Sequence, residues 1–423
     1  MLIKHIRTFK NMQLKKYHNG THRVSSLTDT LDKITPFLKD MGITRVANVT
    51  GLDSIGLPVI TVCRPNSKSL AVSQGKGHCL DAAKVSGIME SIEGFHAENI
   101  DLNVVKDTYN NLKTRQENVI QIDGLARNCE YNFDGDDLID WVKCQSLVVD
   151  KPVWTPYEII TASFLIPEEK GRGFFIADSN GLASGNTIGE AINHALFEVI
   201  ERDCLALWQL TPIDLQHKRR VNPQTINDPF LERLIDKFTT QNILMGVWDI
   251  TNDLNIPTFI CKIVSKENTG VRPAFGIGTH LDKSIALSRA MTEAAQSRLT
   301  FISGARDDQY DDHYEDEISN KVYESWVDEL TLPKDAKLKS YEDIVSISHD
   351  YIEEDQEFMI NQLHRAGLKE IVYADLTKPQ FDIPVVKVVV PGLEGITYPD
   401  RRVLGERAMK YYRKYGVGAC EVT

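Results

Sequence analysis

The stretch GFFIADSNGLASGNTIGEAINHALFEVIERDCLALWQL, residues 173–210, decides the fold class. It opens with a strand-like run, passes through a glycine-containing turn and continues as a long helical pattern. A strand that leads through a turn into a helix is typical of proteins in which helices cover a β-sheet. The chain repeats this order on both sides of the stretch.

Upstream, residues 42–65 predict two strands joined by a turn, and LDAAKVSGIMESIEGFHAENI (80–100) predicts a helix. Downstream, RPAFGIGTH (272–280) predicts a strand and residues 281–304 a helix. The apolar run VVKVVV (385–390) predicts a buried central strand. These serial strand–loop–helix units predict a mixed α/β protein of the α+β class, with helices covering β-sheet in one integrated domain.

The division of the chain follows from the same pattern. We expect residues 1–20 to form an N-terminal extension and residues 21–423 to form the main domain. The part from Asp307 to about Asp355 (307–355) is rich in Asp and Glu and includes DDQYDDHYEDE. We expect it to be a solvated surface excursion rather than a metal site.

Composition excludes several classes of protein. A net charge of −12 over 423 residues argues against a nucleic-acid binder, which needs a surplus of Lys and Arg. No apolar run is long enough to cross a membrane, and the basic first residues lack the pattern of a secretion signal. The 7 cysteines are scattered without a CxxC pair, which fits a reducing compartment. We therefore expect a cytoplasmic protein.

Two of the predicted helices carry acidic faces. Ser86, Glu90 and Glu93 follow each other at spacings of four and three residues, so they share one face. The second helix presents Glu198, Glu201 and Arg202 in EVIERD, with Glu190 two turns earlier. Facing carboxylates of this kind could hold magnesium, which prefers oxygen ligands. The alternative is that each pair is an ordinary charged outer face, although the apolar neighbours indicate partial burial.

Other segments offer groups that suit a phosphate. The third helix carries Glu293, Gln296 and Arg298, with Arg306 soon after, and arginine binds phosphate oxygens bidentately. Lys76 is expected in a flexible loop between two glycines, and Ser184 and Asn186 precede the second helix, where anions are favoured. Turn and capping chemistry explains the last two equally well. The chain contains neither a GxxxxGK[ST] phosphate loop nor a GxGxxG dinucleotide motif.

Taken together, these motifs resemble the YcaO family. The resemblance rests on five motifs in order between about Gly20 and Gly395, namely RVANVTGLDSIGLPV, SQGKG with AAKVSGIMESIE, GLASGNT with EVIERD, TEAAQSRLTFISGARDD, and VVVPGLEG. It implies a catalytic domain that binds ATP and Mg²⁺ between acidic helices and phosphorylates the oxygen of a peptide-backbone amide.

The resemblance also implies roles for individual residues. Magnesium would be held by Glu90, Glu93, Glu198 and Glu201. Nucleotide or its phosphates would be contacted by Lys76, Ser86, Ser184, Asn186, Arg202, Gln296 and Arg298. Catalytic roles would fall to Arg202, Glu190 and Arg306.

Members of the family differ in the nucleophile that attacks the activated amide. An external sulfide gives a thioamide, and a Cys, Ser or Thr side chain of a precursor peptide gives an azoline. The C-terminal KYGVGACEVT lacks the proline-rich pattern of many azoline-forming members, whereas HNGTHR, ANVTGLD and PGLEG are most similar to members that form thioamides with a TfuA partner. We therefore expect thioamide formation on a peptide or protein, with a TfuA-like or peptide-docking partner and a homodimeric enzyme.

Two other classes of function remain open from the residues alone. A carboxylate-bridged dimetal oxidase also uses helical glutamates, and Glu93 with His96 supplies one Glu-x-x-His pair, although EVIERD supplies no second. A non-catalytic scaffold for a partner enzyme is the other alternative.

Overall fold

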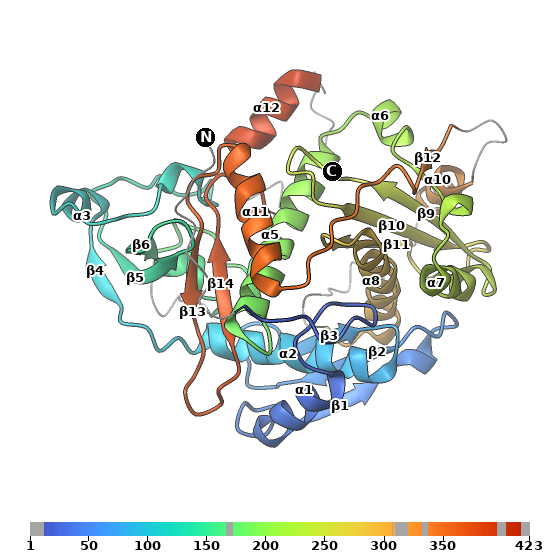
Figure 1. The fold of residues 1–423 in the computed structure, drawn as a ribbon, viewed down its shortest axis with the longest axis horizontal. Coiled ribbons are helices and arrows are strands. Elements are labelled where there is room, and N and C mark those ends of the chain that lie inside the picture. Colours follow the sequence, from blue (N-terminus) through green and yellow to red (C-terminus); the bar gives the residue numbers. More distant parts are fainter. Residues whose placement is uncertain are drawn as a thin grey trace.

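The computed structural model describes residues 12–165, 172–306, 308, 320–331, 337–395 and 403–415. Three long helices lie near the middle of the molecule: α2 (Leu80–Glu98), α5 (Ile188–Gln209) and α8 (Lys283–Ser303) (Figure 1). These are the helices that the three strand–loop–helix units predict. Asp282 caps α8 and Thr187 caps α5 through their side chains, and Gly304 ends α8 in a left-handed conformation.

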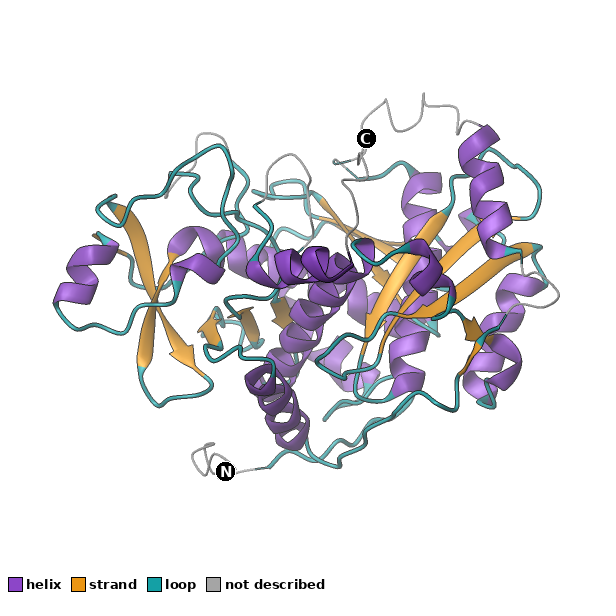
Figure 2. Ribbon diagram, turned by 90° about the horizontal axis from the view of Figure 1, so that it is seen from above, coloured by secondary structure: helices purple, strands orange, loops and turns teal. Residues whose placement is uncertain are grey.

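Antiparallel sheets surround these helices, as Figure 2 shows from above. Two sheets have three strands each, β1 (Arg45–Asn48), β2 (Val59–Cys63) and β3 (Val72–Lys76), and β9 (Ile243–Asp249), β10 (Thr258–Ser265) and β11 (Ala274–Thr279). A larger sheet contains β4 (Val105–Asp107), β5 (Ile139–Ser146), β6 (Pro152–Pro156), β7 (Leu182–Ser184), β13 (Val372–Asp375) and β14 (Val385–Val389). The short strands β8 (Val221–Asn222) and β12 (Lys339–Ser340) pair in parallel.

The remaining helices lie around this framework. They are α1 (Leu27–Ile34), α3 (Tyr109–Thr114), α4 (Tyr157–Ile160), α6 (Ile213–His217), α7 (Pro229–Thr239), α10 (Asn320–Leu330), α11 (Ile352–Arg365) and α12 (Glu406–Tyr415). The mixed α/β class expected from the sequence is therefore confirmed. Within the described residues, no helix is long and apolar enough to cross a membrane.

Glycines let two strands lie directly against their helices. A Cβ added at Gly75 of β3 would lie 2.1 Å from the Ala83 carbonyl oxygen and from the Gly87 nitrogen of α2. A Cβ at Gly278 of β11 would lie 2.1 Å from the Ala286 carbonyl oxygen of α8. Only glycine permits such backbone contact, which holds each helix in one place on its sheet.

The three units meet at the helices. Besides its own strands, α2 contacts β7, α5 contacts β11, and α8 contacts β3. Each long helix thus reaches the strand of another unit, and the ends of β3, β7 and β11 come between helices. Residues carried by these helices and strand ends are far apart in the sequence but neighbours in space.

Two sequence expectations need correction. Lys76 is the last residue of β3 rather than part of a flexible loop, because β3 pairs with β2 along its whole length. The described part of 307–355 is only partly solvated: Tyr341 and Asp355 are 4% and 2% exposed and α10 packs on β9 and β10, whereas most residues of 342–350 are exposed or half-buried. Apolar residues interspersed among the acidic ones produce this packing. The acidic run DDQYDDHYEDE lies outside the described residues, apart from Asp308.

The strand expected from VVKVVV is confirmed. β14 lies between β13 and β7, and all its residues are buried. Lys387, its one charged residue, donates a hydrogen bond to the Asp178 carbonyl oxygen and pairs with the Asp178 carboxylate at 3.3 Å. A buried lysine with such partners is compatible with a central strand.

A candidate site where three helices meet

Glu93 of α2 reaches across to the segment that leads into α5. Its Oε1 accepts hydrogen bonds from the Ser184 backbone nitrogen at 2.8 Å and from the Ser184 hydroxyl at 2.6 Å. Burial raises the pKa of Glu93 to about 8; Ser184 opposes the shift, and Glu90 and Glu198 add to it. The first two predicted motifs therefore meet in space.

Glu90 lies one turn before Glu93 and stays accessible to water. The surrounding protein nevertheless raises the pKa of Glu90 by desolvation, while Arg306 and Lys76 oppose that shift. The shared face of α2 expected from the sequence is thus turned toward the other units. Ser86, on the same face, accepts a 3.4 Å hydrogen bond from the Lys76 backbone nitrogen.

The α5 carboxylates complete this group. Burial raises the pKa of Glu198 to about 7; Arg202, whose Nη2 lies 3.6 Å from Glu198 Oε1, opposes the shift and Glu201 adds to it. Glu201 is 3% exposed and accepts a 2.9 Å hydrogen bond from the Thr279 nitrogen at the end of β11. Burial and then Glu293 raise the pKa of Glu201.

The third helix contributes Glu293, to which the sequence analysis gave no role. Lys76 Nζ lies 2.5 Å from Glu293 Oε2, so the end of β3 is tied to α8. Burial alone would raise the pKa of Glu293, but Lys76 and Arg202 hold it below its usual value. A single glutamate in TEAAQSR carries no sequence signal of its own; only the contact between α8 and β3 reveals its place.

Taken together, these carboxylates and several cations share a partly enclosed space. The glutamates come from α2, α5 and α8, and the cations that lower their pKa values are Lys76, Arg202, Arg289, Arg306 and Lys387. Burial is the largest cause of the raised pKa values of Glu93, Glu198 and Glu201, and neighbouring carboxylates add to it. Carboxylate oxygens of this kind suit a hard divalent ion such as Mg²⁺.

The predicted metal ligands, all of them in the described part of the chain, do not form a ready-made metal site. Among the described residues, no group of three or more His, Cys, Asp or Glu side chains is arranged to hold a metal ion. Glu93 and Glu201 each use an oxygen in a hydrogen bond to protein instead. This suits an ion that arrives with phosphate and keeps water and phosphate among its ligands, as Mg²⁺ does.

Several predicted contact residues are engaged elsewhere. Arg298 forms a buried ion pair with Asp53 at 3.1 Å, although its Nη1 has no partner. Gln296 donates a 2.8 Å hydrogen bond to the Gln74 carbonyl oxygen of β3. Arg306 pairs with Asp308 at 2.6 Å. These contacts fasten α8 and its C-terminal end to neighbouring segments.

Asn186 and Glu190 secure the start of α5. Glu190 Oε2 accepts hydrogen bonds from the Asn186 backbone nitrogen at 2.8 Å and from its side-chain amide at 3.0 Å, while Oε1 accepts one from the Val24 nitrogen. Asn186 Oδ1 in turn accepts a hydrogen bond from the Thr30 hydroxyl at 2.9 Å. Both oxygens of Glu190 thus already have partners in the protein.

His96 does not join the carboxylates. It is fully buried, hydrogen-bonds to the Ile92 carbonyl oxygen at 2.8 Å and packs edge-on against Phe95 and Phe381. Burial lowers the pKa of His96 to about 4. Glu93 therefore lies in a polar environment and His96 in an apolar one. This argues against a carboxylate-bridged dimetal oxidase.

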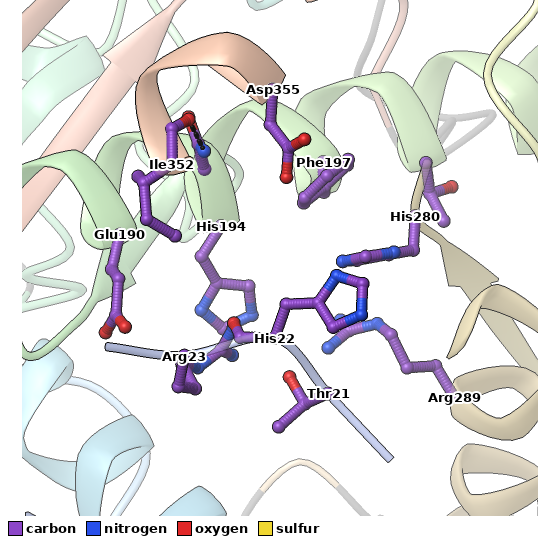
Figure 3. Close-up of a pocket in the computed structure, with 12 residues that line it drawn as sticks. Thr21, His22, Arg23, Glu190, His194, Phe197, His280, Arg289, Ile352 and Asp355 are labelled. Atoms are coloured by element: carbon purple, nitrogen blue, oxygen red, sulfur yellow. Dashed lines mark hydrogen bonds between the residues drawn. The ribbon is translucent and has the colours of Figure 1, made fainter. Parts of the chain in front are cut away.

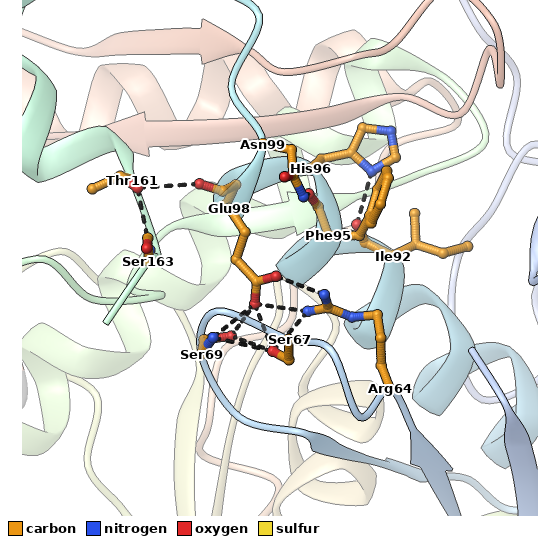
Figure 4. A network of polar contacts seen from close by, with 11 residues as sticks. Arg64, Ser67, Ser69, Ile92, Phe95, His96, Glu98, Asn99, Thr161 and Ser163 are labelled. Atoms are coloured by element: carbon orange, nitrogen blue, oxygen red, sulfur yellow. Dashed lines mark hydrogen bonds and ion pairs between the residues drawn. The ribbon is translucent and has the colours of Figure 1, made fainter. Parts of the chain in front are cut away.

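A buried ion pair anchors the end of α2. Arg64 donates to both oxygens of Glu98, at 2.6 and 2.7 Å, and Ser67 and Ser69 donate to the same carboxylate (Figure 4). Burial would raise the pKa of Glu98, but the hydrogen bonds from Arg64 and the serines lower it. This network clamps the helix that carries Glu90 and Glu93 to the loop after β2.

Comparison with known proteins gives consistent matches. The sequence model of the YcaO cyclodehydratase family, described as ATP- and Mg²⁺-binding, matches residues 74–394. An uncharacterized protein from the tfuA 3′ region of Rhizobium leguminosarum bv. trifolii is 32% identical over 403 residues, 94% of each chain. An uncharacterized protein of Methanothermobacter thermautotrophicus is 32% identical over 386 residues, 89% of this chain and 96% of that one.

Solved structures share the fold. A heterocyclase in complex with substrate and cofactor aligns with a TM-score of 0.78 at 24% identity over 96% of this chain, which spans 56% of the heterocyclase. YcaO from Methanopyrus kandleri, bound with AMPPCP and Mg²⁺, aligns with a TM-score of 0.73 at 19% identity over 93% of this chain and 99% of that one. At these identities the likeness concerns the fold alone.

Proposed function

Because this chain belongs to the YcaO family, we propose that it uses Mg²⁺ and ATP to phosphorylate the oxygen of a peptide-backbone amide, so that an external sulfur donor can convert the amide into a thioamide. Membership makes the chain an ATP-dependent peptide-modifying enzyme with ATP and Mg²⁺ as cofactors. The choice of thioamide formation is supported by the relative from a tfuA 3′ region.

One observation carries the proposal: glutamates from α2 and α5 gather where three units meet, with the pKa of Glu93 at about 8 and that of Glu198 at about 7. Phosphoryl transfer asks the protein mainly to position its reactants and to neutralise charge. Divalent ions held by the oxygens of these carboxylates would help to do so. ATP with Mg²⁺ would supply the phosphoryl group and the positive charge that balances it.

We assign roles to the chain's own residues as follows. Carboxylates of both helices would hold magnesium, and Arg202, held against Glu198, would contact phosphate oxygens and stabilise charge that develops during transfer. Arg306, close enough to lower the pKa of Glu90, would also stabilise that charge, and Glu190 would support the start of α5. The proposed metal ligands are Glu90, Glu93, Glu198 and Glu201; the proposed nucleotide contacts are Lys76, Ser86, Ser184, Asn186, Arg202, Gln296 and Arg298.

The substrate would be a peptide or protein, and a TfuA-like protein would be the partner that delivers sulfur or substrate. The gene-region name of the Rhizobium relative supports such a partner. A homodimer remains our expectation for the assembly.

Intact mass spectrometry tests the proposal. Candidate peptides are incubated with the protein, ATP, Mg²⁺ and sulfide, with and without a TfuA-like protein. Replacement of oxygen by sulfur adds about 16 Da. Glu201→Gln should abolish the gain while the circular dichroism spectrum stays unchanged, whereas a scaffold without catalysis would keep it. No mass change in any combination would refute the proposal.

A second candidate is azoline formation, favoured by the cyclodehydratase description of the family model. In that reaction a Cys, Ser or Thr side chain of the substrate attacks the activated amide. The same experiment separates the two, because cyclodehydration removes about 18 Da and needs no sulfide.

A further inference from the structure

A small cavity lies next to the cluster of glutamates from α2, α5 and α8, at the end of β11. It is lined by the N-terminal segment, α5, β11, α8 and α11. Thr279 forms part of its wall, and the nitrogen of the same residue holds Glu201. The cavity therefore shares a wall with the proposed reaction site, although none of the four proposed magnesium ligands lines it.

Its size limits what it can hold. The centre of a water molecule can move within about 20 Å³ of the cavity, which leaves room for one small molecule or ion. A nucleotide is far too large for this space. A single occupant of the size of water, chloride or hydrosulfide fits it.

Positive charge dominates the lining. Arg23 and Arg289 both face the cavity, and within the described part of the chain neither forms an ion pair. Of the two acidic residues of the lining, Asp355 pairs with Lys15 at 2.7 Å, and Glu190, which accepts hydrogen bonds from the neutral N–H groups of Asn186 and Val24, favours the charged form of Arg23. Arg289 is then the lining charge without a matching carboxylate in the cavity, and an enclosed guanidinium is unfavourable unless an anion accompanies it.

The polar atoms of the lining are short of partners. Buried Nε of Arg289 and Nδ1 of His22 have no hydrogen-bond partner among the described residues. His280 accepts from the Asp282 nitrogen at 2.9 Å through Nδ1, so its Nε2 carries the hydrogen and can donate. Figure 3 shows the rings of His22 and His280 and the Arg289 guanidinium turned toward the same space.

The histidines act here as neutral donors. Burial lowers the pKa of His22 to about 4 and that of His280 well below its usual value, and nearby cations add to both shifts. A neutral imidazole can donate one hydrogen bond without adding charge, so the positive charge comes from the arginines. His280 also packs on Phe197 with ring centroids 4.8 Å apart, which gives the cavity one apolar wall.

We propose that this cavity is a binding site for a small monoanion, and that its physiological occupant is hydrosulfide, the sulfur nucleophile of the reaction. The inference rests on the proposed thioamide formation for the identity of the anion. Arg289 supplies the excess positive charge, the histidine and guanidinium N–H groups supply the donors, and the apolar wall suits a soft, weakly hydrated sulfur.

The chemistry balances. The sulfur of hydrosulfide forms a bond to the activated amide carbon, and the bond from that carbon to the phosphorylated oxygen breaks. The amide oxygen leaves as part of inorganic phosphate, which takes up the hydrosulfide proton, and the nitrogen keeps its hydrogen. ATP is consumed to ADP, and no oxidant or reductant is needed.

Bromide provides a probe that does not depend on catalysis, because it resembles hydrosulfide in charge and size. Crystals soaked in bromide should show an anomalous peak between His22, His280 and Arg289, and added sulfide should remove it. His22→Phe fills the cavity and should abolish the peak. His18→Phe is the matched control: His18 meets His22 edge-on, with ring centroids 4.9 Å apart, but is exposed and does not line the cavity.

Kinetics supply the second readout. His22→Phe should raise the KM for sulfide at least tenfold and leave the KM for ATP within twofold, while His18→Phe changes neither. Absence of the bromide peak, a peak that sulfide does not displace, or an unchanged KM for sulfide in His22→Phe would each overturn the inference. If the wild-type protein forms no thioamide, the proposed function fails, yet the bromide and sulfide soaks still decide whether the anion site exists.

Discussion

At the scale of single residues, the carboxyl groups of the site stand out by their raised pKa values. Glu93 is the clearest case, with a pKa near 8 that results from burial and from its neighbours Glu90 and Glu198. Sequence spacing predicted the shared face of Glu90 and Glu93. It could not predict the pairing of Glu93 with Ser184, which comes from a strand about 90 residues away.

Glu93 should make the ligand-free protein less stable as pH rises. The pKa of Glu93 is about 8 in the folded chain and about 4.5 in the unfolded chain. As the pH rises, the unfolded chain therefore loses this proton first, and the free energy of unfolding falls between about pH 4.5 and 8. Glu93→Gln removes the penalty. At pH 8 its free energy of unfolding should exceed that of the wild type by about 1 kcal/mol or more, and the difference should shrink toward pH 5.

Urea unfolding at several pH values measures this difference. Glu130→Gln, which changes an exposed carboxylate, is the control and should follow the wild type. Parallel pH profiles for Glu93→Gln and the wild type would contradict the assigned pKa.

Binding of Mg²⁺ with ATP should release protons. At pH 7 Glu93 is mostly protonated and Glu198 about half protonated, since their pKa values are about 8 and 7. A metal ion needs both as carboxylates, so between about one and two protons should be released for each complex formed. Calorimetry in two buffers of different ionisation enthalpy counts them, and equal heats in both buffers would speak against metal binding by these groups.

At the scale of helices and strands, much was predictable from the sequence. The three long helices and the strand β14 follow from apolar periodicity and uninterrupted apolar runs. The YcaO family, the mixed α/β class, and ATP and Mg²⁺ as cofactors were also predicted correctly. The placement of Lys76 was wrong, because the glycines around it were read as signs of a loop whereas they permit close packing of β3 on α2.

Some residues of the candidate site could be found from the sequence, and others could not. Glu198 and Arg202 could be found because they lie one turn apart on a helix. Glu293 and Arg289 could not, because their roles follow from how α8 contacts β3 and faces α5, and no local pattern records such contacts. The roles of the predicted site residues stay predictions until they are tested.

Gly75→Ala should weaken the protein through the β3–α2 contact. The added Cβ would meet backbone atoms of α2 at 2.1 Å, and backbone cannot move aside cheaply. We expect a loss of about 2 kcal/mol or more in the free energy of unfolding, together with weaker ATP binding as α2 shifts. Gly51→Ala, where a Cβ meets nothing within 4 Å, is the control. Equal stability of the two variants would show that close packing here is unimportant.

At the scale of the whole molecule, the N-terminal segment packs against residues from late in the chain. Residues 12–24 run beside α11 and α5, with an isolated bridge between Leu14 and Tyr351. Lys15 is 3% exposed, pairs with Asp355 at 2.7 Å and donates a 2.8 Å hydrogen bond to the His349 carbonyl oxygen. Part of the N-terminal extension expected from the sequence thus packs against the body of the protein.

Lys15→Met should destabilise the molecule, because it leaves the buried Asp355 carboxylate without its cation. Breaking one side of a buried pair costs about 3–5 kcal/mol, and we expect a loss near the lower end since His349 also contacts Asp355 at 2.9 Å. Thermal unfolding measures the effect, with Lys16→Met, an exposed neighbour, as the control. A melting temperature equal to that of Lys16→Met would contradict a structural role for this pair.

The central claim is that carboxylates of α2 and α5 together hold the divalent ions that accompany ATP. Anomalous diffraction from crystals grown with Mn²⁺ and a non-hydrolysable ATP analogue tests it most directly. We predict manganese peaks within about 2.0–2.3 Å of carboxylate oxygens drawn from both pairs, Glu90 with Glu93 and Glu198 with Glu201. Manganese bound only to phosphate and water, or only to carboxylates elsewhere on the protein, would contradict the account.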